Sequence, residues 1–457
     1  MVLHIWPYNF VGAFRAPASG RMRTGDMNPT ASIDGLPSST APLAGVRVVE
    51  VSSFIAAPLC GMTLAQLGAE VVRVDPIGGA ADYHRWPVTD DGESIYWAGL
   101  NKGKRSFAAD FRDPQAHTLI RDLITDAGVL VTNAAGRDWL DYDSLAAIRP
   151  DLIHVQVLGR ADGGSGVDYT VNAAAGFPLA TGPVGHAGPV NHLLPAWDLA
   201  CGLYAALSVA SAVHRREVTG AGAKIVLPLE DVALATAGNL GYLAEAQLGG
   251  PERARIGNSV YGTYGRDFTT SDGVAFMVVA LTPRHFRDLT ELTGTTVAVG
   301  ALESALGADF RDEGDRYRHR EVLDALFAVW FREHTAAEVE AALAGTSILH
   351  ERYRTFAEIA KDPRVTANPM FQYVDQPRVG GHLAPSLPMS FDGHHPAPRP
   401  APANGDDTAA VLAEHLGLTP QEIDRLATDG TIRVPAGTLP ALEKDLAVCP
   451  ASPRPSA

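Results

Sequence analysis

Cysteine is scarce in this chain, which contains 3 cysteines among 457 residues. Cys60, Cys201 and Cys449 lie far apart and form no CxxC pair, so the sequence supports neither a disulfide framework nor a zinc knuckle. We therefore expect no metal site. A reducing, cytoplasmic compartment fits this composition best.

Positive charge is in deficit, because 37 Lys and Arg residues face 52 Asp and Glu residues and give a formal net charge of -15. Nonspecific binding of nucleic acid or of an anionic membrane surface needs a clustered basic face. We expect neither partner. Any anionic ligand must then be bound by local basic groups.

Long apolar runs are also lacking. The longest extends from about Leu199 to Val213 and is shorter than the roughly 20 residues that a bilayer requires, so we expect a buried helix there. Residues 1–44 lack periodicity and the residue order of a secretory signal. They are expected to form a flexible N-terminal tail, with a start at Met22 or Met27 as the alternative.

Several common catalytic motifs are missing. The chain contains no HExxH, GxxxxGK[ST] or GxSxG sequence, which argues against the usual zinc-protease, P-loop and α/β-hydrolase classes. The turn after the first predicted strand reads SSFIAAP instead of GxGxxG, so binding of a nicotinamide dinucleotide has little support. Asp75 is interpreted as a polar residue at a strand end.

What the chain does contain, from Gly45 onward, is an alternation of short apolar runs and helical segments. This order is typical of an α/β fold with a doubly wound parallel sheet. Strands are predicted at 46–51, 70–75, 128–133 and 151–159, and helices at 58–68, 114–126 and 143–148.

The second half of the chain has a different pattern. Helices dominate from about 196 to 248, a strand pair is predicted within 257–281, and helices follow near 283–293 and 319–346. The stretch after 376 is rich in Pro and Gly, so an extended excursion over the surface is expected there. The predicted parts are a tail (1–44), a large domain (45–240), a small domain (241–355), and a linker with a C-terminal return to the large domain (356–457).

One carboxylate stands out in GGSGVDYTVNAAAGFPLATG, residues 163–182. Asp168 precedes an apolar segment, as a helix N-cap does, although Val171 occupies the position where a capping box has Glu or Gln. A carboxylate at the ligand-binding edge of a sheet can also attack an acyl group and form an anhydride. The residues alone leave both roles open.

Basic side chains follow several predicted strands. Each of them taken singly is more simply a solvated surface charge, yet parallel sheets bind ligands beyond the carboxyl ends of their strands. These residues are Arg73, Lys102, Lys104, Arg105 and Arg137.

Long, ordered segments of the sequence resemble the family III coenzyme A transferases from about Gly45 to Gly430. They include GVRVVEVSSFIAAPLCGMTLAQLGAEVVRVDPIGG, YWAGLNKGKRSFAADFRDP, GGSGVDYTVNAAAGFPLATGPV, LPAWDLACGLYAAL, HRREVTGAGA, GNSVYGTYGRDFTTSDG and NGDDTAAVLAEHLGL. The resemblance implies a Rossmann-like large domain, a smaller α+β domain and an interlocked homodimer.

The resemblance also implies an activity. It favours transfer of CoA between the C1 and C4 carboxyls of one molecule of 2-methylfumaryl-CoA (mesaconyl-CoA), giving 3-methylfumaryl-CoA. The alternatives are transfer between two different carboxylic acids and a CoA-ester binder without catalysis. No cofactor is expected beyond the CoA moiety of the substrate.

Site residues follow from the same resemblance. Gly166, Val167 and Asp168 occupy the position of the family's GYD pattern, and the resemblance implies that Asp168 is the nucleophile. The preceding loop, GRADGGSG, is shorter than usual, which favours the intramolecular reaction. A glycine-rich cover over the acyl intermediate is implied at 257–265. The CoA-binding residues implied by position are Phe54, Ala56, Arg73, Lys104, Arg105, Asn133 and Arg137.

Transfer within one diacid also requires a cation for its free carboxylate. The candidates are Arg160, His192 and Arg266.

Overall fold

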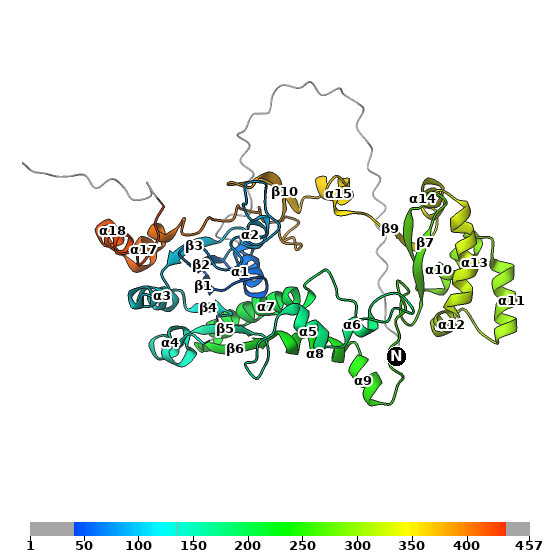
Figure 1. Ribbon diagram of the computed structural model, residues 1–457, viewed down its shortest axis with the longest axis horizontal. Helices are drawn as coiled ribbons and strands as arrows, with labels where there is room; N and C mark the ends of the chain where they lie inside the picture. Colours follow the sequence, from blue (N-terminus) through cyan, green and yellow to red (C-terminus); the bar gives the residue numbers. More distant parts are fainter. Residues whose placement is uncertain (1–40, 135, 436–457) are drawn as a thin grey trace, which may run out of the picture. The chain divides into compact units, whose positions relative to one another are not determined.

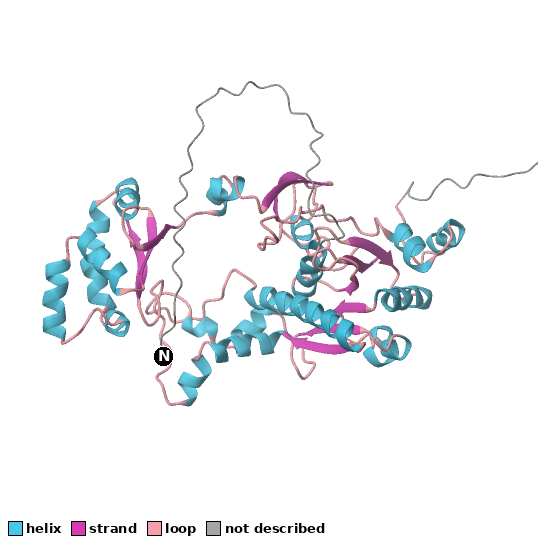
Figure 2. Ribbon diagram, turned by 180° about the vertical axis from the view of Figure 1, so that it is seen from behind, coloured by secondary structure: helices cyan, strands magenta, loops and turns pink. Residues whose placement is uncertain are grey.

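The structure, a computed structural model, describes residues 41–134 and 136–435 (Figures 1 and 2). Cys449 and nearly all of the predicted N-terminal tail lie outside these residues.

A six-stranded parallel sheet forms the centre of the large domain, with the order β3-β2-β1-β4-β5-β6. A parallel sheet was expected, but only four of these strands were predicted from the sequence. Its central strands are short runs rich in Val, Leu and Ile, and both faces are buried, which is typical of parallel sheets. The strands are β1 (Arg47–Val51), β2 (Glu70–Pro76), β3 (Arg105–Ala109), β4 (Val129–Thr132), β5 (Ile153–Leu158) and β6 (Ala223–Pro228).

Helices cover the two faces of this sheet and close one apolar core on each side (Figure 1). On one face lie α1 (Ala56–Gln66), α7 (Ala196–Thr219) and α8 (Leu229–Asn239), and on the other lie α3 (Pro114–Ala127), α4 (Tyr142–Ile148), α17 (Thr408–Leu416) and α18 (Pro420–Thr428). Shorter helices are α2 (Ile95–Leu100), the 3-10 turn η2 (Asp138–Leu140), α5 (Asp168–Ala174), α6 (Phe177–Ala180) and α9 (Tyr242–Gln247).

Helix α7 is the one described helix long and apolar enough to cross a membrane by length and composition. It instead packs one face into the core, as expected, against α1. Gly202 permits this close approach, because a Cβ there would lie 2.6 Å from the carbonyl oxygen of Ala56. The opposite face of α7 leaves Leu203 and Leu207 exposed.

The predicted strand pair in the second half is confirmed and has a third, antiparallel neighbour. The predicted helix over 319–346 is wrong as a single element, because Thr335 caps a new helix and forms a capping box with Glu338. The elements are β7 (Tyr264–Thr269), β8 (Ala275–Ala280), α10 (Pro283–Leu292), α11 (Thr296–Leu306), α12 (Glu313–Arg318), α13 (Arg320–Glu333), α14 (Ala336–Leu343) and β9 (Leu349–Arg352).

The Pro- and Gly-rich stretch is less irregular than expected. After α15 (Phe356–Ile359) and α16 (Pro363–Thr366), strands β10 (Phe371–Gln376) and β11 (Gly380–Pro385) form a hairpin. Pro377 lies in the turn of this hairpin. Both strands are edge strands, so the hairpin contains no central strand from which proline would be excluded. The chain then reaches β3, where the Asp407 carboxylate accepts from the backbone N–H of Ser106 at 2.8 Å.

Candidate active site

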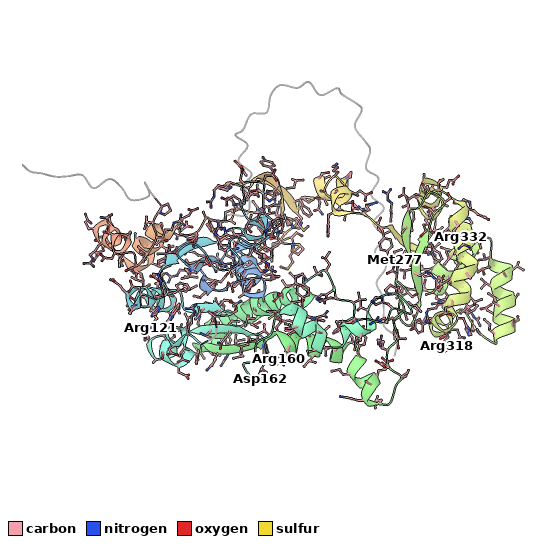
Figure 3. All side chains as sticks on the ribbon, viewed as in Figure 1. Arg121, Arg160, Asp162, Met277, Arg318 and Arg332 are labelled. Atoms are coloured by element: carbon pink, nitrogen blue, oxygen red, sulfur yellow. The ribbon has the colours of Figure 1, made fainter. Side chains whose placement is uncertain are left out.

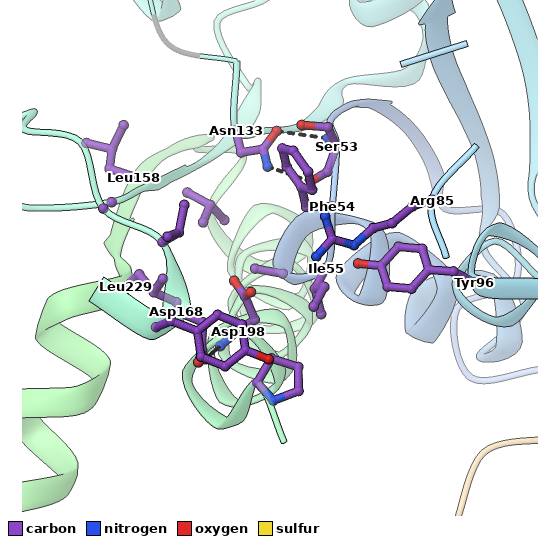
Figure 4. A pocket seen from close by; sticks show the side chains of 17 residues that line it. Ser53, Phe54, Ile55, Arg85, Tyr96, Asn133, Leu158, Asp168, Asp198 and Leu229 are labelled. Carbon is purple, nitrogen blue, oxygen red and sulfur yellow. Dashed lines mark hydrogen bonds between the residues drawn. The ribbon is translucent and has the colours of Figure 1, made fainter. Parts of the chain in front are cut away.

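A cavity of about 330 Å³ lies beyond the carboxyl ends of β1, β4 and β5 (Figure 4). The strand order reverses between β1 and β4, and open parallel sheets bind ligands at such a point. The cavity is lined by Ser53, Phe54, Ile55, Ala56, Arg85, Tyr96, Asn133, Val157, Leu158, Gly159, Gly166, Val167, Asp168, Tyr169, Pro195, Asp198 and Leu229.

Asp168 is the first residue of α5 and is only 2% exposed. Its carboxylate does not cap its own helix, so the N-cap interpretation is wrong: Val167 occupies that position. Instead, Oδ2 accepts hydrogen bonds from the backbone N–H groups of Trp197 at 2.7 Å and Asp198 at 3.1 Å. These donors belong to the first turn of α7, whose positive end stabilises a negative charge.

The other oxygen of Asp168 faces His192. Asp168 Oδ1 lies 2.8 Å from His192 Nε2, and because a carboxylate oxygen only accepts, Nε2 carries the proton. Asn172 fixes the same region, since its Oδ1 accepts from Trp197 Nε1 at 3.0 Å and its Nδ2 donates to Asn191 Oδ1 at 2.6 Å. The carboxylate is therefore held in one orientation by two backbone N–H groups of α7 and by the His192 side chain, which precedes α7.

The turn after β1, the start of α1 and the end of β4 form the facing wall, which includes the predicted residues Phe54, Ala56 and Asn133. The backbone N–H of Ser53 donates to Asn133 Oδ1 at 3.0 Å, and Asn133 Nδ2 donates to the Ser53 carbonyl at 2.8 Å. Phe54 adopts a positive φ of 69° and is 41% exposed. Two neighbouring strand ends are thus tied together beside the nucleophile candidate.

Two glycines let the loop before Asp168 close on itself. A Cβ on Gly159 would lie 2.3 Å from the backbone nitrogen of Gly166, which no backbone tolerates without moving. Both glycines line the cavity, and Gly166 is two residues from Asp168. The glycine-rich sequence therefore serves a close approach of backbone segments.

Sequence reasoning missed two charged residues of this cavity, Arg85 and Asp198. The pKa of Asp198 is raised to about 7, chiefly because burial disfavours the charged form, with the Asp168 charge adding to the effect and Arg85 opposing it. The Arg85 guanidinium lies 5.4 Å from the ring centroids of both Phe54 and Tyr96. No local motif marks either residue, because tertiary contacts bring them together.

Arg73, a predicted CoA contact, is fully buried and does not line this cavity. It binds the carboxylates of Asp75 at 3.0 Å and Asp82 at 2.9 Å, and it also donates to Asn101. A direct contact with a ligand would require this ion-pair network to open. Asp75 is a polar residue at a strand end, as interpreted from the sequence.

Lys104 belongs to the same buried network. Its Nζ lies 2.8 Å from Glu50 Oε2 and donates to the carbonyl of Pro58 at 2.8 Å. Burial lowers the pKa of Lys104 to about 8, against the attraction of Glu50. Lys104 thus neutralises a buried carboxylate, and nearby Lys102 donates to the Gly99 carbonyl.

Arg105 begins β3, at the amino end of the strand and away from the cavity. Its Nη1 lies 2.6 Å from both Glu70 Oε1 and Glu414 Oε2. Glu70, Glu414 and His415 are the one group of described residues whose ligand atoms lie close enough to hold a metal ion. Arg105 already provides positive charge to both carboxylates, so nothing calls for a metal there.

Arg137 lies in a second cavity, of about 390 Å³, together with His154 and Lys224. Its guanidinium lies 5.1 Å from the Phe111 ring centroid. The structure therefore separates Arg137 from the other predicted CoA-binding residues Phe54, Ala56 and Asn133.

The three candidate cations for a carboxylate are placed differently. His192 is bound to Asp168. Arg160, on the loop after β5 (Figure 3), lies 3.7 Å from Glu230 and does not line the Asp168 cavity. Arg266 is on β7 and forms an ion pair with Asp324 at 2.6 Å. Neither arginine stands beside Asp168.

The predicted glycine-rich cover, 257–265, lies outside the lining of the Asp168 cavity. The backbone N–H of Gly257 donates to the carbonyl of Gly182 at 3.1 Å. Arg255 continues this contact by donating to the carbonyl of Leu179 at 2.8 Å. The segment is thus docked on the loop that follows α6, and its role as a cover stays a prediction.

The chain is thus an α/β protein with a buried carboxylate at the switch point of its parallel sheet, where such sheets bind ligands. The chain belongs to CoA-transferase family III, because the sequence profile of that family matches residues 43–408. The resemblance inferred from the sequence is confirmed, and the protein is an enzyme of this family.

The chain is similar to individual proteins of this family to different degrees. The chain is 48% identical over 401 residues to 2-methylfumaryl-CoA isomerase of Chloroflexus aurantiacus, covering 86% of this chain and 98% of the relative. It is 27% identical over 400 residues to succinyl-CoA–D-citramalate CoA-transferase of the same organism, covering 84% and 96%. A solved CAIB/BAIF family protein from Brucella suis matches with a TM-score of 0.69 and 28% identity, covering 82% of this chain and 99% of that one.

Proposed function

We propose that this enzyme moves CoA between the C1 and C4 carboxyls of 2-methylfumaryl-CoA, giving 3-methylfumaryl-CoA. The observation that carries the proposal is the Asp168 carboxylate, buried and oriented on the wall of a cavity at the switch point of the sheet. The similarity to an isomerase with this substrate in its name supports the choice of acyl group.

In the first step, Asp168 Oδ1 attacks the C1 thioester carbonyl. The C1–S bond breaks, CoA leaves as a thiolate, and an aspartyl anhydride remains. The thiolate then attacks Asp168 Cγ, forms an aspartyl thioester and releases the C1 carboxylate. The C4 carboxylate attacks the same carbon in turn, the Cγ–S bond breaks, and a second anhydride forms. The thiolate then attacks C4, the bond between C4 and the aspartyl oxygen breaks, and the Asp168 carboxylate is regenerated.

The first turn of α7 stabilises the middle steps. Attack on Asp168 Cγ places negative charge on Oδ2, which already accepts from the N–H groups of Trp197 and Asp198 at 2.7 and 3.1 Å. Donors at this distance, fixed before the reaction, are worth on the order of 3 kcal/mol each in acyl-transfer transition states. His192 orients Oδ1 as the attacking atom.

Because the site retains both the diacid and the CoA thiolate, each attack by one of them on the Asp168 intermediate is effectively unimolecular. The effective molarity of such a step can reach about 10⁵ M or more. One thioester replaces another, so the reaction needs no added cofactor. CoA itself would reach Asp168 past Phe54, Ala56 and Asn133, which line the cavity. We further propose a homodimer in the cytoplasm, with no nucleic-acid or membrane partner.

The test of this function uses Asp168→Ala. We expect turnover of 2-methylfumaryl-CoA to be abolished while the fold and the binding of CoA esters persist, because alanine removes only the attacking group. Activity close to that of the unchanged enzyme would refute the nucleophile.

The alternative, transfer between different acids, is distinguished by adding labelled free mesaconate. Intramolecular transfer predicts no label in the CoA-ester pool. Ready incorporation would instead identify an intermolecular CoA-transferase.

A further inference from the structure

The diacid keeps at least one free carboxylate next to Asp168 throughout the proposed reaction. A carboxylate in a partly closed cavity is costly unless a cation or hydrogen-bond donors compensate its charge. Arg85 is the one Lys or Arg side chain among the described residues that line the Asp168 cavity.

The guanidinium of Arg85 has its donors available. It forms no hydrogen bond and no direct ion pair with another described residue, although its charge acts on the Asp198 carboxylate, which lines the same cavity. The Phe54 and Tyr96 rings, with centroids 5.4 Å away, hold it in the wall of the cavity. Arg85 and Tyr96 stand on one side and Asp168 and Asp198 on the other (Figure 4).

The backbone of Arg85 is fixed by the buried network described above. The backbone N–H of Arg85 donates to the carbonyl of Asp82 at 3.2 Å, and Ser94 Oγ donates to the carbonyl of Arg85 at 2.6 Å. The Asp82 carboxylate is bound in turn by Arg73 at 2.9 Å. Arg73 therefore positions the turn that carries Arg85, although it is closed off from the cavity itself.

We propose that Arg85 binds the carboxylate of the diacid that is not in thioester or anhydride linkage, and so selects dicarboxylic acyl groups. This inference rests on the proposed function. The C4 carboxylate occupies Arg85 while Asp168 reacts at C1, and the C1 carboxylate occupies it while Asp168 reacts at C4. The trans diacid has a carboxyl at each end of a short rigid skeleton. When the diacid turns end for end, the same nucleophile and the same cation therefore serve the opposite carboxyls.

The test compares two esters and three variants. The esters are 2-methylfumaryl-CoA and 2-methylcrotonyl-CoA, in which a methyl group replaces the free carboxylate. The variants are Arg85→Gln, Arg85→Lys and, as the control, Arg160→Gln. The readout is the rate at which Asp168 becomes modified when hydroxylamine traps the acyl intermediates, together with the isomerisation rate.

We expect Arg85→Gln to lower kcat/KM for 2-methylfumaryl-CoA by about 100-fold, the loss typical of removing one partner of a desolvated charge pair. Trapping with 2-methylcrotonyl-CoA should change by less than about threefold, because that ester offers no charge to Arg85. Arg85→Lys should restore part of the lost activity, and Arg160→Gln should change neither ester.

Equal losses with both esters, or no loss with either, would overturn the role of Arg85. If Arg85→Gln does not fold, Arg85→Lys carries the same comparison with a smaller selective loss. Absence of any Asp168 modification in the unchanged enzyme would refute the proposed function instead, so the two failures are distinguishable.

Discussion

At the scale of single residues, the two oxygens of Asp168 have different surroundings, and the proposed mechanism gives them different roles. Oδ1 lies beside His192, whereas Oδ2 accepts from two backbone N–H groups of α7. The family resemblance of the sequence identified Asp168 as the candidate nucleophile. It could not indicate these partners, because Trp197 and Asp198 lie 29 and 30 positions further along the chain.

The role of the α7 N–H groups is testable with Asp198→Pro, which removes one donor at a position in the first helical turn where proline is tolerated. Asp198→Ala is the matched control, since it removes the same side chain but keeps the N–H. We expect kcat of the proline variant to fall below that of the alanine variant by about 100-fold. Equal kcat values in the two variants would exclude this contribution.

The raised pKa of Asp198 predicts a pH-dependent stability. Asp198 titrates near pH 7 in the folded protein, against a normal value of 3.8, so the folded state holds a proton that the unfolded state has lost. The contribution of Asp198 to the free energy of unfolding is fully present below pH 3.8 and is lost as pH rises through about 7. Asp168 and Arg85 are the charged groups that face it.

Asp198→Asn should therefore gain stability relative to the unchanged protein as pH rises from about 4 to about 7, by up to about 1.4 kcal/mol per pH unit. Urea unfolding of both proteins across this range measures the difference, and groups common to both cancel. A difference that stays constant with pH would contradict the buried, neutral state of Asp198.

At the scale of elements, the order of strands and helices in the large domain was predictable because its apolar runs are separated by clear helical segments. Strands β3 and β6 were missed. Strand β6 lies in the stretch from about 196 to 248 that was predicted to be mainly helical, and the short sequence of β3, RSFAA, follows the basic segment NKGK and was interpreted only as a ligand-binding region. Arg73 and Lys104 were interpreted likewise, although their charges serve buried carboxylates. A charge pattern cannot distinguish these cases, because both place basic residues near strand ends.

The loop that carries Asp168 makes its own prediction. Gly159→Ala would push a Cβ to 2.3 Å from the Gly166 nitrogen, so the backbone must shift next to the nucleophile. Misplacement by about 1 Å can cost about 100-fold in rate, and we expect kcat to fall by that order with a loss of about 1–3 kcal/mol in unfolding free energy.

Gly300→Ala is the control for this substitution, since nothing lies within 4 Å of its Cβ position on α11. It should leave kcat unchanged. Full activity of Gly159→Ala would show that the close approach of the two glycines does not position Asp168.

At the scale of the whole molecule, the proposed homodimer predicts that an exposed apolar surface becomes covered. On the outer face of α7, Leu203, Tyr204 and Leu207 are 55%, 51% and 61% exposed. Leu207→Glu should weaken self-association by about 30-fold or more, the cost of losing an anchor residue at an interface. Light scattering over a dilution series measures this, with exposed Val297→Glu on α11 as the control.

A monomeric unchanged enzyme, or a Leu207→Glu variant that associates as before, would contradict the assignment of this face. The sequence alone could not identify it, because α7 is apolar on both sides and only the fold shows which side faces the core. The family resemblance supplied the expectation of a dimer, and the exposed side chains supply its place.

The central claim is that Asp168 exchanges an oxygen with the diacid. A single turnover with 2-methylfumaryl-CoA whose free carboxylate carries heavy oxygen tests it, followed by mass spectrometry of the peptide that contains Asp168. The C4 carboxylate attacks Asp168 Cγ and later leaves one of its oxygens behind, so the account predicts one heavy oxygen in that peptide. Formation of 3-methylfumaryl-CoA with no heavy oxygen on Asp168 would contradict it.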